Sequence, residues 1–542
     1  MKKRNPCGAL FLAPLCGALV LMMVAECRFF SAAAIGAQEI PDELRQQTLR
    51  FVRQLAETGL PVQEIPSWMK PLNHHGPWAA DVTLYRQGEI RGKGQAADPL
   101  FSSALEKAAK AAMPASTEGL DLQDSRFLIS VTSPKHRPIA LIEWHGKAEE
   151  LAGNVTAVRV LDKALIFRQI EAGKQYLLRV MHPEKHGFYK KYDVLRDDFG
   201  NRLRTIYSAS SLLTLLKISD VDSDKAIAGV TPRIAEFLLS MQCQDQATHG
   251  AFYYAYYLDS QTKQNKFVVG TTSKAIFTLL ELYRRNQDPR YLEAARSAGD
   301  WLLTMLNPDG SVINQVKDHN GQWVYDKRYS CLYTGQVLSA LSRLYRTTLD
   351  PRYYTAAEMI ARLTIKRARA QKYFMKDDYR YPEDPVPTSW VVMSLLDFYK
   401  IKRDAAAGHT LFKSARVLLK RQYRNPDDLV NFGRFKGTEA TSGNGWIGEV
   451  LGEVYALGRE EKKKDLEAFK NALLRLIRWL IQNTYSEKNM FFLKTPAKAI
   501  GGLIRNPHEE SVRTDAVCHG INGYLNIWQE LNEGPLLTVP EK

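Results

Sequence analysis

The sequence predicts a multidomain protein of α+β and then all-α class, with a small N-terminal α+β domain followed by an (α/α)6-type helical toroid. Two observations lead to this prediction. A helical hairpin repeats along the C-terminal two-thirds of the chain, and the N-terminal part has the short alternating stretches of β-strands. With 542 residues, 45% of them hydrophobic, the chain is long enough to build two or three separate cores.

The clearest internal repeat joins two segments that lie 62 residues apart. The run Leu282-Tyr283-Arg284 followed by Asp288-Pro289 recurs as Leu344-Tyr345-Arg346 followed by Asp350-Pro351. In each copy one apolar helix ends at Leu-Tyr and a second begins at Asp-Pro. Aspartate caps the free N–H groups of a helix start, and proline suits the first turn. Each copy is therefore predicted to be a helical hairpin.

The same alternation extends in both directions and predicts six first helices and five second helices. The first helices are expected to begin near Arg204, Thr271, Arg328, Thr388, Ser442 and Arg513. The second helices are expected near 231–243, 289–306, 351–366, 407–423 and 464–484. A sixth second helix is either missing or supplied by the N-terminal region. The spacing of roughly 55 to 70 residues favours a closed toroid over an open tetratricopeptide-like stack, whose period is about 34 residues.

Small residues mark the starts of several first helices, as at Gly270, Gly335 and the run 442–445. Helices that converge on a central axis need such residues, because large side chains would collide there. Hairpins of this length, the run GQVLSALSRLY at 335–345 and the run RTDAVCHG at 513–520 together resemble the six-hairpin glycosidase superfamily. Its relatives include the C-terminal domain of glucuronyl C5-epimerases and the N-acylglucosamine epimerases. The resemblance implies a toroid over residues 201–542 and a function in carbohydrate metabolism.

Residues 38–200 differ in texture from the rest. Stretches at 80–85 and 127–131 alternate like strands, and a helix is expected from about Leu100 to Ala112. The run VTLYRQGEIRGKG at 82–94, with that helix and the following strand, resembles an AMMECR-like α+β domain. This likeness implies a fold more than a function. Lys93 stands where that family commonly has a cysteine after the Arg-Gly pair, so no role of such a cysteine is transferred.

The N-terminus predicts export. A basic start at 1–4 precedes an uncharged stretch at 8–25, so residues 1–37 are expected to be a signal peptide or a membrane anchor. The protein is then periplasmic or secreted, and membrane-anchored if the segment is not cleaved. The formal charge of +15 favours an anionic partner, such as an acidic polysaccharide or a membrane surface, and nucleic acid is not expected outside the cytoplasm. A merely solubilising basic surface is the equal alternative.

No motif for a cofactor or a metal ion is found. The cysteines beyond the N-terminal segment, Cys243, Cys331 and Cys518, are far apart and form no CxxC pair. The sequence contains no phosphate-binding glycine loop, no histidine cluster with metal-binding spacing and no Gly-x-Ser-x-Gly elbow. We therefore expect no cofactor, no bound metal, and cysteines that serve as small buried hydrophobic residues.

Catalytic candidates are expected where loops enter the first helices, because that rim of a toroid holds the ligand. Glu439, Asp515 and His519 are the candidates for acid/base chemistry. Asp515 and His519 are four residues apart, so one face of a helix presents both. The alternative interpretation makes Asp515 a helix cap and packs His519 inside.

Sugar-binding candidates share the same rim. Arg513 is expected to bind an anionic group, and aromatic rings are expected to stack on sugar faces. The full set of predicted substrate-binding residues is Arg513, Tyr333, Trp390, Trp446, Tyr329, Tyr254 and Asp384. The aromatic run around Tyr254 fits an ordinary hairpin with one packed face equally well.

Three functions follow as hypotheses. A glycoside hydrolase that acts on a neutral or acidic polysaccharide or oligosaccharide needs two carboxylates across the scissile bond. A uronosyl epimerase or lyase would instead rely on Tyr333, His519 and Arg513, because it removes a proton beside a carboxylate that must be neutralised. A non-catalytic glycan-binding or envelope assembly protein is the third alternative.

Overall fold

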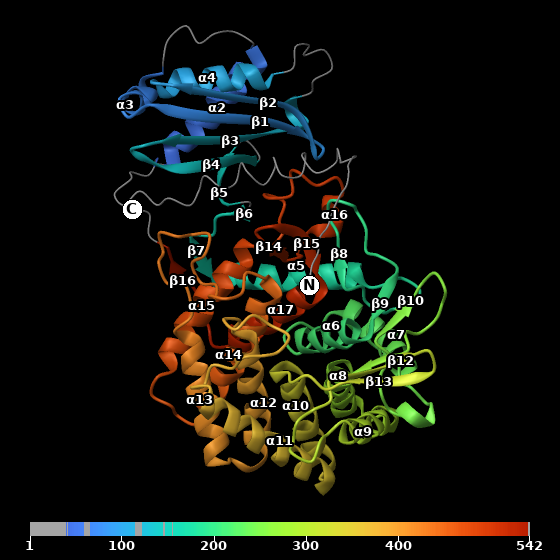
Figure 1. The fold of residues 1–542 in the computed structure, drawn as a ribbon. Helices are drawn as coiled ribbons and strands as arrows, with labels where there is room; N and C mark the ends of the chain where they lie inside the picture. The colour runs from blue at the N-terminus through green and yellow to red at the C-terminus, as the bar shows by residue number, and fades with distance from the viewer. Residues whose placement is uncertain are drawn as a thin grey trace, which may run out of the picture. The chain divides into compact units, whose positions relative to one another are not determined.

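A computed structural model describes residues 40, 42–58, 66–113, 122–144, 147–153 and 155–539 (Figure 1). The signal or anchor predicted at 1–37 lies outside the described residues. The chain divides into two compact units, with the boundary after Gly153. This boundary lies well before the one expected at residue 200. Within the described ranges, no helix has both the length and the apolar character that a membrane crossing requires.

Unit 1 combines helices with a sheet in which β2, β1, β3, β4 and β5 lie side by side in this order, and β4 is antiparallel to both β3 and β5. The large side chains of Trp78, Phe101 and Phe127 are fully buried in its core. The predicted strands at 80–85 and 127–131 and the predicted helix at 100–112 are confirmed. Its elements are α2 (Asp42–Thr58), a 3-10 turn (Ser67–Met69), α3 (Lys70–Asn73), β1 (Trp78–Arg86), β2 (Glu89–Asp98), α4 (Phe101–Ala112), a second 3-10 turn (Leu122–Asp124), β3 (Ser125–Ser133), β4 (His136–Trp144) and β5 (Lys147–Ala152).

Unit 2 contains, within its described residues, six inner helices that alternate with six outer ones. The inner helices are α6 (Thr205–Ile218), α8 (Val269–Asn286), α10 (Cys331–Thr348), α12 (Val386–Lys402), α14 (Thr441–Glu460) and α17 (Thr514–Trp528). The outer helices are α5 (Lys163–Val180), α7 (Lys225–Ser240), α9 (Pro289–Thr304), α11 (Pro351–Ala370), α13 (Ala405–Leu419) and α15 (Leu466–Gln482). Each inner helix begins within three residues of its predicted start.

The inner helices form a closed ring. Each packs on the next in chain order from α6 to α17, and α17 packs back on α6. Helix α5, which comes before the first inner helix, packs on α17 and serves as its outer partner. The sixth second helix is therefore α5, which comes from residues before 200. For this reason the domain boundary lies earlier in the chain than expected. Figure 1 shows the helices of this unit arranged around one another below the label of β7.

The hairpin turns repeat one local design. Asp288 accepts a hydrogen bond from the backbone N–H of Arg290, and Asp350 accepts one from Arg352, each at 3.0 Å. The residue just before each aspartate, Gln287 or Leu349, is left-handed with φ near +58°. The predicted aspartate caps are thus confirmed, and each turn reverses the chain between an inner and an outer helix.

The inner helices are buried around nearly their whole circumference. In α6, every residue except Ile206 and Lys217 is buried. Glycine permits this packing at specific points, because a Cβ atom at Gly335 would lie 2.9 Å from the carbonyl oxygen of Trp390, and one at Gly270 would collide with Gln336. The small residues predicted to line the convergence of the inner helices have this role.

Short sheets form one rim of the ring and run directly into inner helices. β9 leads into α6, β11 into α8 and β15 into α17, so the last strand residue caps each helix. Side chains at these junctions are therefore placed at the helix N-termini. The remaining elements are β6 (Val155–Thr156), β7 (Val160–Asp162), β8 (Lys191–Tyr192), β9 (Arg202–Arg204), a 3-10 turn (Gln246–Thr248), β10 (Ala255–Tyr257), β11 (Lys266–Val268), β12 (Gln315–His319), β13 (Gln322–Asp326), α16 (Pro496–Ala499), β14 (Ile504–Asn506), β15 (Glu509–Arg513) and β16 (Pro535–Thr538).

We predict that Gly335→Ala destabilises unit 2 by about 1–3 kcal/mol, because the new methyl group overpacks the contact between α10 and α12. Gly229→Ala is the control, since a Cβ atom there meets nothing within 4 Å and α7 gains about 0.5–1 kcal/mol of helix stability. Denaturant-induced unfolding of the two variants checks both signs. Equal stability of Gly335→Ala and the wild type would contradict the close packing described here.

Candidate active site at the rim of the inner helices

Arg513 and Asp515 form a two-pronged ion pair at the start of α17. The guanidinium donates to both carboxylate oxygens, at 2.9 and 2.6 Å, and its Nη2 also donates to the hydroxyl oxygen of Tyr207 on α6 at 2.9 Å. The side chains of Arg513 and Asp515 are 24% and 22% exposed, so solvent reaches both. The rim therefore presents a rigid, oriented carboxylate.

Electrostatics keep Asp515 ionised. Burial alone would raise its pKa, but the charge and hydrogen bonds of Arg513 outweigh burial and hold the pKa of Asp515 below its ordinary value. Burial raises the pKa of Tyr207, so its hydroxyl stays protonated. At neutral pH this group of residues offers a carboxylate base or nucleophile beside a neutral hydroxyl.

His519 lies one turn deeper on α17 and is bound to a carboxylate that the sequence analysis missed. Its Nδ1 lies 2.7 Å from Oε2 of Glu449 on α14, and both side chains are largely buried, at 12% and 7% exposure. Burial would raise the pKa of Glu449, but the hydrogen bond to His519 and the charge of Lys217 hold it well below its usual range. Glu449 thus orients the imidazole as an acid/base group would require.

Trp390 and Trp446 do not present open faces to a sugar. They are buried, and their rings stack on each other at a centroid distance of 3.9 Å. Lys274 of α8 lies over both rings, 5.3 and 4.9 Å from their centroids, and burial lowers its pKa to about 8. Since α8 and α14 are opposite in the ring, these side chains bridge its axis. They form a floor beneath the rim, and the stacking role expected for the two tryptophans is replaced by a structural one.

Tyr254 and Tyr333 lie closer to the rim. Arg204 and Lys266 lie over the ring of Tyr254, at 4.5 and 4.6 Å from its centroid, so cations already occupy the ring expected to stack on a sugar. Tyr333 contacts Tyr379 edge-on at 5.9 Å, and burial raises its pKa to about 12. Both tyrosines are half-buried, and the raised pKa keeps the hydroxyl of Tyr333 protonated.

The other predicted residues serve mainly local structure. Asp384 is buried, accepts a hydrogen bond from the backbone N–H of Val386 at the start of α12, and pairs with Arg380 at 2.9 Å. The ring of Tyr329 is covered by Arg367 at 3.6 Å.

Glu439 differs from Asp384 and Tyr329, because no close partner among the described residues holds its side chain. It precedes α14 at the same rim, is 50% exposed, and makes loose ion pairs of 3.6 Å with Arg434 and 3.7 Å with His508. It lies on the loop that leads into the inner helix beside α17.

Glu449 and Lys274 had a recognisable signal. Both are charged residues within stretches of small and apolar residues of first helices, and such positions face the interior of a ring. The partly buried ion pair between Arg343 and Asp397, at 3.0 Å, follows the same pattern between α10 and α12. A search for charges inside predicted inner helices would have found all four residues.

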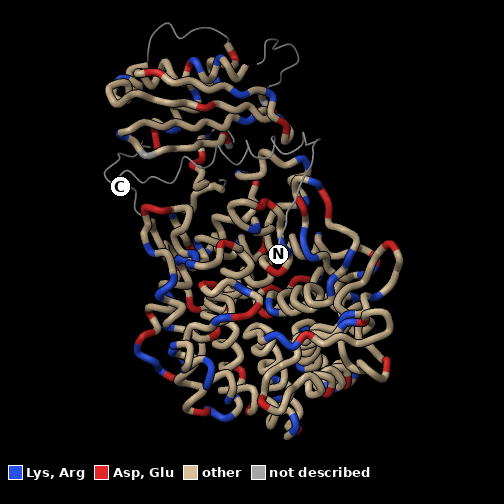
Figure 2. The backbone as a smooth tube through the Cα atoms, in the orientation of Figure 1, with Lys and Arg blue, Asp and Glu red and all other residues tan. Residues whose placement is uncertain are grey.

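No metal centre is seen within the described part of the chain, where no group of three or more His, Cys, Asp or Glu side chains is placed to hold an ion. Cys243, Cys331 and Cys518 are free and buried, as expected. Burial raises the pKa of Cys331 and of Cys518 to about 12, so these thiols stay protonated. Figure 2 shows basic and acidic residues interspersed along the chain of unit 2. Local clusters of charge are therefore the candidates for binding a charged ligand.

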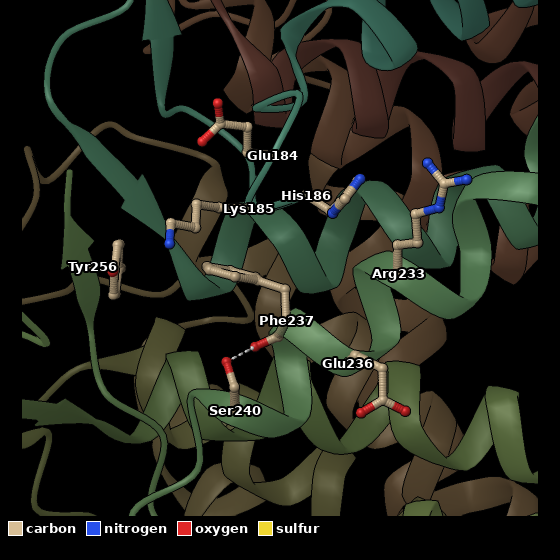
Figure 3. Close-up of a pocket in the computed structure, with 8 residues that line it drawn as sticks. All are labelled: Glu184, Lys185, His186, Arg233, Glu236, Phe237, Ser240 and Tyr256. Atoms are coloured by element: carbon tan, nitrogen blue, oxygen red, sulfur yellow. Dashed lines mark hydrogen bonds between the residues drawn. The ribbon is translucent and has the colours of Figure 1, made fainter. Parts of the chain in front are cut away.

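A pocket of about 490 Å³ lies elsewhere, on the outer side of unit 2 (Figure 3). It lies between the turn after α5 and helix α7, and Lys185 lies over the ring of Tyr256 at 5.8 Å. The ten predicted site residues are not among its lining residues, which are Glu184, Lys185, His186, Arg233, Glu236, Phe237, Ser240 and Tyr256.

Comparison with known sequences supports a carbohydrate-active protein. Residues 257–383, from β10 to the loop before α12, match the family described as glycosyl hydrolase family 76. A comparison with curated proteins gives no match. The chain is therefore similar to glycoside hydrolases over one central segment of unit 2.

Solved structures agree on the fold. Cellobiose 2-epimerase from Bacillus thermoamylovorans B4167 superposes with a TM-score of 0.55 at 14% identity, over 68% of this chain and 99% of the epimerase. Unit 2 is a six-hairpin toroid. A sugar epimerase from a ruminal bacterium (TM-score 0.53, 11% identity, 68% and 98% covered) and a GH76 alpha-mannanase from Bacteroides thetaiotaomicron (0.50, 11%, 66% and 94%) share it. The AMMECR-like character of unit 1 stays a prediction.

Glu449→Gln is predicted to destabilise unit 2 by about 3 kcal/mol at pH 7, because it leaves His519 and Lys217 without their buried carboxylate. The folded-state pKa of Glu449 is depressed, so its stabilisation is present above the unfolded pKa of about 4.3 and is lost as the pH falls below that value. Unfolding free energies of the variant and the wild type should therefore converge in acid. The exposed Glu487→Gln serves as the control, and a difference that is independent of pH would contradict this assignment.

Proposed function

We propose that this chain is an exported glycoside hydrolase that acts on a polysaccharide or oligosaccharide. The observation that carries the proposal is the ionised Asp515, held by Arg513 at the rim of a closed ring of helices. The match of residues 257–383 to a glycosyl hydrolase family supports the substrate class. Export follows from the charge pattern of residues 1–37, and an uncleaved segment would anchor the protein to a membrane. Nucleic acid is not a proposed partner.

In the proposed reaction, Asp515 is the base or nucleophile and Glu439 is the general acid. Asp515 suits its role because Arg513 keeps it ionised without removing it from solvent. Glu439 comes from the adjacent loop and donates its proton to the glycosidic oxygen as the C–O bond breaks. Tyr207 and Tyr333 supply hydroxyls that bind sugar hydroxyl groups.

A uronosyl epimerase or lyase is the second candidate, and the pair of His519 and Glu449 is the observation that favours it. An imidazole fixed by a carboxylate at Nδ1 leaves Nε2 to remove a proton beside a uronate carboxylate. In that reaction Tyr333 returns a proton to the other face of the sugar carbon, or the leaving group departs with elimination.

Asp515→Asn is predicted to lower the rate of reducing-end release from a panel of neutral and acidic glycans by about 10³-fold. Glu439→Gln should lower the rate by a comparable factor. The loss should be smallest for substrates with a good leaving group, because such a group departs without a proton from a general acid. Asp465→Asn is the matched control, since Asp465 pairs with Arg416 at 2.5 Å far from the rim, at the start of the outer helix α15. Full activity of Asp515→Asn would refute the proposed mechanism.

The two reactions leave different products, so one further measurement separates them. Incubation of uronate oligosaccharides in D2O incorporates deuterium at C5 in an epimerase, and a lyase gives an unsaturated product that absorbs in the ultraviolet. For a hydrolase we predict neither signal, and His519→Gln should retain more activity than Asp515→Asn. Binding of glycans without any turnover would instead favour a non-catalytic glycan-binding protein of the envelope.

A further inference from the structure

Positive charge is concentrated at one part of the rim, where β8, β9, β11 and β15 meet α6, α8 and α17. Lys190 is exposed and Arg204 and Lys266 are half-buried, so the group is reachable from solvent. The nearby carboxylates are already engaged, since Asp515 binds Arg513 and Asp326 binds Arg328. Among the described residues, Lys190, Arg204 and Lys266 form no ion pair with a carboxylate, and Arg204 and Lys266 lie over the same tyrosine ring, that of Tyr254.

Arg204 is the central member of this cluster. It is the last residue of β9 and caps α6, where the helix dipole makes the surroundings of a cation less favourable. Its guanidinium lies over the ring of Tyr254, and its Nη1 is buried without a hydrogen-bond partner among the described residues. A buried guanidinium N–H normally donates to an acceptor, so this atom points to a ligand that supplies one.

The other two cations come from segments next to β9. Tyr189, the residue before Lys190, forms an antiparallel bridge with Leu203, the residue before Arg204, and Lys266 lies over the same Tyr254 ring as Arg204. The carbonyl of Lys266 accepts from the N–H of Tyr254 at 3.0 Å, and the carbonyl of Lys190 accepts from the N–H of Thr514 at 3.1 Å. Partial desolvation of the amino group lowers the pKa of Lys190, although the residue as a whole is exposed, and the charges of Arg513 and Arg204 lower it further. Burial and the charge of Arg204 likewise lower the pKa of Lys266. An anion bound among them relieves this mutual repulsion.

We propose that Arg204, Lys190 and Lys266 form a subsite for an anionic substituent of the substrate sugar, a carboxylate, sulfate or phosphate group. This inference rests on the proposed action on glycans and names their class as acidic. It replaces Arg513 as the anion-binding residue, because both prongs of that guanidinium are bound to Asp515. The positive N-terminal ends of α6, α8 and α17 at the same rim add to the attraction.

The test measures binding of the full-length protein by calorimetry. The probes are an oligogalacturonate, its neutral methyl ester, and sulfated and phosphorylated oligosaccharides of the same length. We expect one anionic probe to bind at least tenfold more tightly than the methyl ester. Arg204→Gln and Lys266→Gln should each remove about tenfold or more of this preference, as loss of a hydrogen bond to a charged group does, and leave binding of the ester unchanged.

Lys263→Gln is the matched control. Lys263 lies on the same segment as Lys266, but its Nζ donates to the carbonyl of Ser240 on α7 and lies over Tyr253. It should therefore leave the preference for acidic probes intact. Arg204→Lys, which keeps the charge, should retain more of the preference than Arg204→Gln, and far-ultraviolet circular dichroism with the melting temperature verifies that each variant folds.

The outcomes separate the inference from the proposed function. Equal affinity for acidic and neutral probes, or an acidic preference that survives in folded Arg204→Gln, overturns the subsite whether or not glycans are cleaved. An Arg204-dependent preference without any bond cleavage supports the subsite and refutes the hydrolase. The anionic probe that binds most tightly identifies which of the three groups the subsite takes.

Discussion

The architecture of unit 2 depends on one packing constraint: its inner helices must be buried around nearly their entire circumference. A ring satisfies this constraint because each inner helix packs on two inner neighbours and on one outer helix. The remaining face of each inner helix lies toward the axis of the ring. Glycine at positions such as 270 and 335 lets the backbones approach, while Trp390, Trp446 and Lys274 fill the space that is left at the axis. The rim above this floor is where polar side chains of several helices can meet.

The repeated elements of the fold could be predicted from the sequence because their signals are local. An Asp-Pro pair after a Leu-Tyr helix end identifies a hairpin by itself, and the hairpins set the spacing of all the inner helices. The origin of the sixth outer helix could not be predicted in this way, since α5 has no first helix before it and its partner, α17, lies at the far end of the unit. Only the closure of the ring joins them.

The candidate site was predictable in part for a similar reason. Positions near helix starts located Arg513 and Asp515 at the rim, and their i, i+2 spacing allowed a direct ion pair. Whether a side chain faces the axis, a neighbour or solvent depends on helix rotation, which the sequence pattern of an all-round buried helix does not reveal. Trp446 therefore pointed to a sugar in sequence but packs on Trp390 in the structure, and Glu449 was overlooked beside it.

Closure through α5 has a consequence for how unit 2 can be divided. Its first helix is the outer partner of its last one, and near the two ends of the unit β7 pairs with β16. The unit is therefore a closed circle of hairpins, and the two ends of its chain lie next to each other in that circle. A fragment that starts at residue 201 would lack α5 and the pairing of β7 with β16, and the face of α17 that packs on α5 would be exposed. A circular permutant, in which the two ends of the unit are joined and another loop is opened, would keep every contact between neighbouring helices.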